Sequence, residues 1–356
     1  MLLTRHMKTP SSGWLAMVRW MSGLLPLPLV FLLALSLGIS GCQSRPGVAP
    51  ENQHRQGSNP IQITATVGMV ADLVRKVGGD QVQVHQLCGA GVDPHLFRPT
   101  RDDIAMLLNA DMVFYSGLML EGKLASSLEK AGRHRRVVAV TQQLSESFLL
   151  EEEGGGHHDP HVWMDVAAWS ECVTVVTKHL SAFDPEHSAL YESNAALYRE
   201  QLRSLDEYGE KSIATIPAES RVLVTSHDAF HYFGRAYDLE VLGVQGLSTE
   251  SEAGLRKINE LVRRLASQKI QAVFVESSVP RKNMEALMEG VRARGHQLRI
   301  GGELYSDAMG EAGTYEGTYL GMLDHNITLV TRALGGTAPV DGWSGRLNKT
   351  PSESQP

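Results

Sequence analysis

Short runs of β-branched and other apolar residues recur along the chain, and they alternate with longer stretches whose apolar positions lie three or four residues apart. The first pattern is typical of buried strands and the second of amphipathic helices. Candidate strands occupy residues 61–67, 82–87, 112–115 and 137–140, and then 221–225, 241–243, 272–275 and 298–300. Because strands that alternate with helices favour parallel sheets covered by helices, we expect an α/β fold with two lobes.

Residues 184–217 separate the two sets of strands and predict one long helix. Asp184 and Pro185 provide an N-cap residue and a proline at the first helical position, and no further proline occurs before Pro217. Apolar residues then step by four and three positions, at Tyr191, Ala195, Tyr198, Leu202 and Leu205. About 28 helical residues would form a rod of roughly 40 Å. We interpret this helix as the connection between the lobes; a surface helix of one larger domain is the alternative.

The remaining segments complete the expected domain order. Residues 61–183 form an N-terminal lobe and residues 218–336 a C-terminal lobe, on either side of the helix. Residues 42–60 and 337–356 are polar and lack apolar periodicity. We therefore expect a flexible tether before the first lobe and a polar tail after the second.

The first 41 residues are typical of a lipoprotein signal peptide. Arg5, Lys8 and Arg19 precede an uncharged, leucine-rich run, which ends in small residues directly before Cys42. Signal peptidase would make Cys42 the first residue of the mature protein, with its thiol carrying lipid. The alternative is a retained transmembrane helix, which the prolines in this run disfavour. We expect an extracytoplasmic protein that is anchored to the membrane by lipid at Cys42.

Charge and cysteine content narrow the possible partners. Removal of the leader changes the formal net charge from −7 to −10. An acidic surface disfavours nucleic acid and suits a receptor for cations. Only Cys88 and Cys172 remain after Cys42, and nothing near them indicates a disulfide between them.

Four candidate metal ligands follow strands or precede helices. His95 and His161 each end an Asp-Pro-His tripeptide, and the proline limits the directions in which the imidazole can point. His227 and Asp307 follow candidate strands of the second half. Ligands of α/β proteins bind at this edge of the sheet, and imidazole and carboxylate groups from two lobes would complete the coordination of one divalent cation. A single histidine is more often a capping or surface residue, and spacing does not prove that the four meet.

The chain resembles the TroA/ZnuA-type metal-binding lipoproteins of ABC importers. The resemblance covers residues 61–335 and is carried by segments 92–96, 159–165, 225–230, 245–252, 274–280 and 301–310. It implies two (β/α)4-type lobes joined by one long helix, with metal ligands at His95, His161, His227 and Asp307 in the cleft between the lobes. It also implies high-affinity binding of one metal ion and delivery to an ABC permease and its cytoplasmic ATPase. Three imidazoles favour zinc, whereas a bidentate carboxylate admits manganese or iron.

Four other residues are candidates for auxiliary roles. His231 stands where the family tends to have glycine; it is four residues from His227 on a predicted helix, so it is either an additional ligand or a hydrogen-bonded histidine. Glu276 ends a candidate strand and either orients a ligand or caps a helix. His157 and His158 lie in an acidic, glycine-rich loop that is either simply solvated or collects metal weakly.

Two other classes of function are compatible with the sequence. A lipid-anchored zinc hydrolase would keep one coordination position open for water. The chain contains no His-Glu-x-x-His motif, no Gly-x-Ser-x-Gly elbow and no P-loop, and four protein ligands favour binding over catalysis. A surface adhesin of the same fold is a third possibility. We expect a monomeric, non-enzymatic receptor.

Overall fold

The computed structural model describes residues 54–55, 57, 59–151 and 156–347. The leader 1–41, Cys42 and most of the expected tether lie outside the described residues, as do the last nine residues of the expected tail, 348–356. No helix within the described part of the chain combines the length and the apolar character that crossing a membrane requires.

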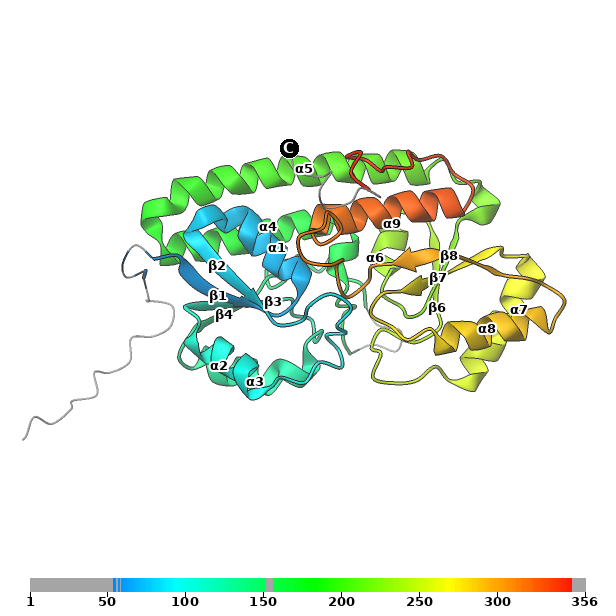
Figure 1. The fold of residues 1–356 in the computed structure, drawn as a ribbon, viewed down its shortest axis with the longest axis horizontal. Helices are drawn as coiled ribbons and strands as arrows, with labels where there is room; N and C mark the ends of the chain where they lie inside the picture. The colour runs from blue at the N-terminus through cyan, green and yellow to red at the C-terminus, as the bar shows by residue number, and fades with distance from the viewer. Residues whose placement is uncertain (1–53, 56, 58, 152–155, 348–356) are drawn as a thin grey trace, which may run out of the picture. The chain divides into compact units, whose positions relative to one another are not determined.

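The first lobe contains a four-stranded parallel sheet. In chain order its strands are β1 (Ile61–Ala65), β2 (Val82–Gln86), β3 (Met112–Tyr115) and β4 (Arg136–Ala139), and their order in the sheet is β2-β1-β3-β4. Helices α1 (Gly68–Gly78) and α4 (Val166–Phe183) cover one face, and α2 (Arg101–Asn109) and α3 (Ala125–Gly132) cover the other (Figure 1). Two buried apolar clusters, one on each face, hold these layers together.

The second lobe is built on two pairs of parallel strands. The pairs are β5 (Val222–Thr225) with β6 (Glu240–Gly243) and β7 (Ala272–Glu276) with β8 (Arg299–Leu304), and β5 lies next to β7. Helices α7 (Leu255–Gln268) and α8 (Lys282–Arg292) enclose one apolar cluster with these strands, whereas α6 (His231–Tyr237) and α9 (Tyr319–Ala333) contribute to the main core. The strands predicted from the sequence are present, although β8 continues to Leu304 instead of ending at residue 300.

The predicted long helix is confirmed as α5 (Ser188–Ile213), which has 26 residues and passes along both lobes (Figure 1). Its predicted apolar stripe is buried. A short 3-10 turn (Pro185–His187) precedes it, with Asp184 at its N-cap position and Pro185 at its start as predicted, although the Asp184 side chain makes no cap hydrogen bond. The Asp184 carboxylate instead accepts hydrogen bonds from Tyr191 Oη at 2.7 Å and Arg55 Nη1 at 2.6 Å.

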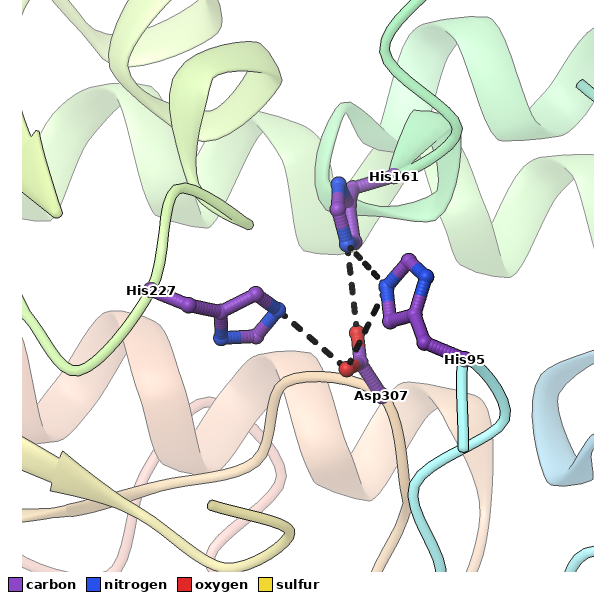
Figure 2. Close-up of side chains that lie close together, drawn as sticks. All are labelled: His95, His161, His227 and Asp307. Carbon is purple, nitrogen blue, oxygen red and sulfur yellow. Dashed lines mark hydrogen bonds and ion pairs between the residues drawn. The ribbon is translucent and has the colours of Figure 1, made fainter. Parts of the chain in front are cut away.

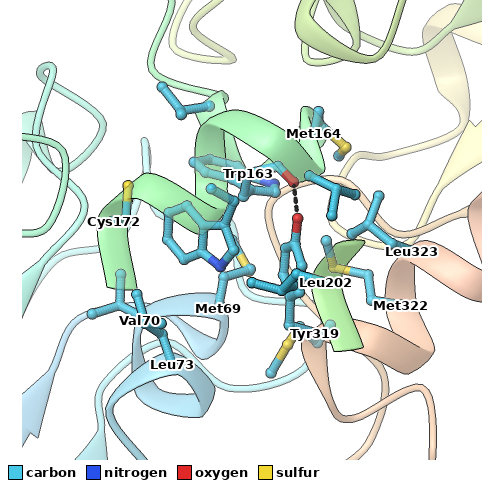
Figure 3. Packing of buried hydrophobic residues seen from close by; sticks show 14 of the residues in the cluster. Met69, Val70, Leu73, Trp163, Met164, Cys172, Leu202, Tyr319, Met322 and Leu323 are labelled. Carbon is cyan, nitrogen blue, oxygen red and sulfur yellow. Dashed lines mark hydrogen bonds between the residues drawn. The ribbon is translucent and has the colours of Figure 1, made fainter. Parts of the chain in front are cut away.

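The main core connects the two lobes beneath α5. Trp163 and Tyr319 are fully buried in it, together with Leu202 of α5 and Met322 of α9 (Figure 3). Tyr319 Oη donates to the carbonyl of Trp163 at 2.7 Å, and Trp163 Nε1 donates to the carbonyl of Ser306 at 2.9 Å. Trp163 lies two residues after His161, and Ser306 precedes Asp307. These bonds therefore fix candidate ligands from different lobes relative to each other.

Two further features concern the cysteines and the C-terminal segment. Cys88 and Cys172 are both buried and free, and burial raises the pKa of each thiol. Residues 337–347 of the expected polar tail form turns against α9, and the Asp324 carboxylate accepts from Trp343 N at 2.7 Å and Ser344 N at 3.3 Å. Asp324, which anchors these turns, is a buried residue of α9. The sequence of the tail itself therefore contains no periodic pattern that would predict them.

Candidate metal centre

Four side chains that are far apart in the sequence meet between the two lobes. His95 lies in the loop after β2, His161 precedes the 3-10 turn Val162–Met164, His227 follows β5, and Asp307 follows β8 (Figure 2). Each offers one ligand atom, and these four atoms all lie within 4.8 Å of one another. The structure therefore brings together the four residues that the sequence analysis singled out, and they form a single candidate metal site.

The imidazoles present their Nε2 atoms to the Asp307 carboxylate. Asp307 Oδ1 lies 3.3 Å from His161 Nε2, and Asp307 Oδ2 lies 3.2 Å from His227 Nε2. His95 Nε2 lies 3.3 Å from His161 Nε2 and 3.8 Å from Asp307 Oδ2. Donor atoms of the types that bind transition metals thus surround one point from several directions.

The centre is almost completely shielded from solvent. His161 and His227 are 0% exposed, Asp307 is 1% exposed and His95 is 4% exposed. Both Asp307 oxygens and His227 Nε2 lack a hydrogen-bond partner. Buried polar atoms without partners are costly, so the arrangement is better suited to a bound cation than to the side chains alone.

Two carboxylates hold the outer edges of the histidine rings. His161 Nδ1 lies 2.7 Å from Asp159 Oδ1, and His227 Nδ1 lies 2.6 Å from Glu276 Oε2. An ionised carboxylate only accepts hydrogen bonds, so each Nδ1 carries the proton and the Nε2 lone pair can face the centre. The Glu276 carboxylate therefore lies against the ring of a candidate ligand.

The aspartates of the two Asp-Pro-His tripeptides also accept hydrogen bonds from the backbone of the histidines. Asp93 Oδ1 accepts from His95 N at 2.8 Å, and Asp159 Oδ1 accepts from His161 N at 2.9 Å. These aspartates were not predicted as functional residues, since only the prolines of the tripeptides were expected to direct the imidazoles. The signal that could have found them is the repeated aspartate two residues before each histidine, a spacing that favours a local side-chain-to-backbone bond.

The three histidines of the site differ in pKa, because burial and the neighbouring carboxylates affect each of them differently. Burial lowers the pKa of His95 to about 4. Burial also opposes charge on His161, but Asp159 and Asp307 outweigh it and raise the pKa of His161 to about 9. Glu276 and Asp307 likewise overcome burial and hold the pKa of His227 well above its usual value. In the metal-free protein, protons on His161 and His227 therefore balance the negative charge of the carboxylates, as a bound metal cation would.

The remaining candidates lie outside this group of four. His231 Nδ1 is 3.5 Å from Asp159 Oδ2, whereas His161 contacts Asp159 Oδ1, and 38% of the His231 side chain is exposed. His157 and His158 line a cavity of about 190 Å³, which His95 also lines. His158 Nε2 lies 3.6 Å from Glu146.

The chain is similar to known proteins over most of its length. Residues 63–333 match the family described as zinc-uptake complex component A, periplasmic. The chain is 45% identical over 288 residues to the manganese-binding lipoprotein MntA of Bacillus subtilis (strain 168), covering 81% of this chain and 94% of that protein. It is 47% identical over 277 residues to the zinc-binding protein TroA of Treponema pallidum (strain Nichols), covering 77% and 89%.

Solved structures agree with these sequence relationships. The periplasmic zinc-binding protein TroA from Treponema pallidum superposes with a TM-score of 0.75 at 46% identity, covering 77% of this chain and 99% of that one. The Fe(III)-bound YtgA from Chlamydia trachomatis gives a TM-score of 0.71 at 28% identity, covering 78% and 99%. The two-lobed fold joined by α5 is thus the fold of these proteins. The chain belongs to the ZnuA/TroA family of extracytoplasmic metal-binding proteins, which are transport components of ABC importers and not enzymes.

Proposed function

We propose that this protein binds one divalent transition metal ion with high affinity through His95, His161, His227 and Asp307. The observation that carries the proposal is the convergence of three Nε2 atoms on a carboxylate whose two oxygens have no hydrogen-bond partner. Four protein groups surround the ion, so no position is left open for a reacting water, which argues against a zinc hydrolase.

The cargo that fits this donor set is zinc or manganese, with iron as a further candidate. The relatives named above are described as binding manganese, zinc and Fe(III). If one Asp307 oxygen binds, the site offers the four-coordinate geometry that zinc prefers. If both oxygens bind, the coordination number increases, and oxygen ligands suit manganese.

The test is metal content and affinity, measured in the same preparations. Protein purified without chelator should contain about one metal ion per chain, because a buried site with four donor groups retains its ion. His161→Ala, His227→Ala and Asp307→Asn should each reduce affinity by more than the roughly 10–100-fold loss expected for an outer partner of a ligand. His134→Ala, which removes an exposed histidine, serves as the control. Unchanged affinity in two of the three ligand variants would show that the ligand set is wrong.

The partner is a permease of an ABC importer, and we propose that the complex includes a cytoplasmic ATPase. In this scheme the monomeric protein occupies the extracytoplasmic side, anchored by lipid on Cys42 after removal of residues 1–41, and it has no role in nucleic-acid binding. Residues 42–60 then provide the tether, residues 61–183 and 218–336 the lobes, residues 184–217 the linker and residues 337–356 the tail.

The lipid anchor is tested by substitution of Cys42. Cys42→Ser should abolish incorporation of labelled lipid; normal labelling of this variant would contradict the anchor.

We assign supporting roles to the auxiliary residues. Glu276 positions His227 through the 2.6 Å contact, and His231 supports Asp159 without binding metal. His157 and His158 lie where an ion that approaches His95 would pass, because all three line the same cavity.

A further inference from the structure

Residues 245–252, here named the strap, leave the second lobe at the end of β6 and extend to the first lobe. The base of the strap is bonded on both sides of His227. Gln245 N donates to the carbonyl of Ser226 at 3.0 Å, and Asp228 N donates to the carbonyl of Gly246 at 3.4 Å. The strap therefore starts from the loop that carries one candidate ligand.

The tip of the strap contacts the loop that carries another candidate ligand in the opposite lobe. Thr249 Oγ1 donates to Asp93 Oδ2, and Asp93 Oδ1 accepts from His95 N at 2.8 Å. One carboxylate thus joins the strap to the backbone of His95. A change in the position of Thr249 is transmitted to His95 through a single side chain.

A second contact between strap and first lobe is an ion pair. Lys123 Nζ lies 2.9 Å from Glu250 Oε2, with 33% and 43% of these side chains exposed. We call the Thr249–Asp93 hydrogen bond and the Lys123–Glu250 ion pair the two latch contacts. Neither involves a metal ligand directly, and both cross between the lobes.

The strap also lines the cavity next to His95, the least buried ligand of the metal centre. Leu247, Ser248 and Glu250 line the cavity of about 190 Å³ together with His95 and His157. His95 is 4% exposed, whereas His161 and His227 are 0% exposed. The cavity lined by the strap therefore gives an ion a route past His95, the most exposed of the candidate ligands.

We infer that the strap is the gate of the metal site, and that Thr249, Glu250 and Lys123 set the rate at which the ion leaves. The inference rests on the proposed function and adds positioning residues to it. The ion keeps its ligands while the latch contacts hold the strap to the first lobe. Release requires both contacts to break, because the strap otherwise stays against the cavity beside His95 and holds His95 N through Asp93.

The test measures the rate of zinc or manganese release from the full-length protein in detergent into excess chelator. Glu250→Gln and Thr249→Val should each release metal about two- to five-fold faster, the range expected for losing one partly exposed polar contact. Thr249→Ser keeps the hydroxyl and should behave as wild type. The double charge reversal Lys123→Glu with Glu250→Lys should restore slow release. High salt should accelerate wild type and leave Glu250→Gln unchanged.

A matched control comes from the same lobe. Arg281 Nη2 lies 2.8 Å from Glu303 Oε2, and this exposed pair does not cross to the first lobe. Glu303→Gln makes the same change of charge and should leave release unchanged. Wild-type rates in both Glu250→Gln and Thr249→Val, or equal acceleration in Glu303→Gln, would overturn the gate while leaving metal binding intact. Failure of the wild-type protein to load zinc or manganese would overturn both the gate and the proposed function.

Discussion

Glu276 holds His227 by two bonds from one buried carboxylate. Its Oε2 lies 2.6 Å from His227 Nδ1, and its Oε1 accepts from His227 N at 2.9 Å. Both side chains are 0% exposed. Glu276, the last residue of β7, therefore contacts both the ring and the backbone of a candidate ligand.

Glu276→Gln should lower metal affinity by about 10- to 100-fold, the usual effect of losing a carboxylate behind a histidine ligand. The amide keeps the shape of the side chain but not its charge, so His227 becomes a weaker base. Affinity should be measured by calorimetry with zinc and with manganese. Glu285→Gln, an exposed change on α8, is the control. Equal affinities for Glu276→Gln and wild type would mean that the pair has no role in metal binding.

The sequence predicts the fold and much of the site because each depends on local patterns. β-Branched runs mark the strands, and the apolar stripe from Tyr191 to Leu205 marks α5. The four candidate ligands stand at strand or helix ends, in motifs that the family resemblance covers. These features can be recognised without knowing how the lobes pack.

Contacts that depend on the packing of distant segments could not be predicted in this way. Thr249 and Asp93 are 156 residues apart in the sequence, and their bond exists only because the lobes face each other. The partner of Glu276 could not be identified either, since His227 is 49 residues away, in the loop that follows another strand. Asp324 likewise anchors the tail from a buried position that only the tertiary structure defines.

Asp324→Ala should destabilise the protein without changing its metal ligands. The carboxylate accepts from Tyr315 Oη at 2.9 Å and from Trp343 N at 2.7 Å, and the substitution leaves these donors without a partner. Each orphaned buried group costs about 1–3 kcal/mol. Thermal or denaturant unfolding of the metal-free protein should show the loss, whereas Asp341→Ala, an exposed change in the tail, should not. Wild-type stability in Asp324→Ala would contradict this anchoring role.

The stability of the metal-free protein should fall as pH rises through the upper end of the neutral range. The pKa of His161 is raised from 6.5 to about 9 in the fold, so the folded state binds more protons than the unfolded state between these values. Its contribution to stability is fully present below pH 6.5 and is lost as pH rises through about 9. The melting temperature with chelator present should therefore decrease across this window.

Asp159→Asn tests the origin of that decrease. The asparagine removes the charge beside His161 Nδ1, so the pKa of His161 should fall and the slope with pH should become shallower. Metal-loaded wild type should also lack this slope, because the ion has already displaced the proton. A melting temperature that rises or stays constant between pH 6.5 and 9 in the metal-free protein would refute the assignment.

Metal binding at pH 7.5 should release about two protons per ion. His161 and His227 both have raised pKa values and are protonated in the metal-free protein at this pH, whereas burial lowers the pKa of His95 to about 4 and leaves it neutral. Metal binding requires a free Nε2 on each ring, while the Nδ1 protons remain on the sides facing Asp159 and Glu276.

Calorimetry in buffers of different ionisation enthalpy measures this number directly. Asp159→Asn should reduce proton release by about one, because His161 is the one candidate ligand whose pKa Asp159 raises. His231→Ala should leave proton release unchanged if His231 supports Asp159 without binding the ion. Apparent affinity should also keep rising with pH up to about pH 9, where His161 loses its proton without metal. Release near zero in wild type, or a loss of one proton in His231→Ala and none in Asp159→Asn, would show that other imidazoles bind the metal.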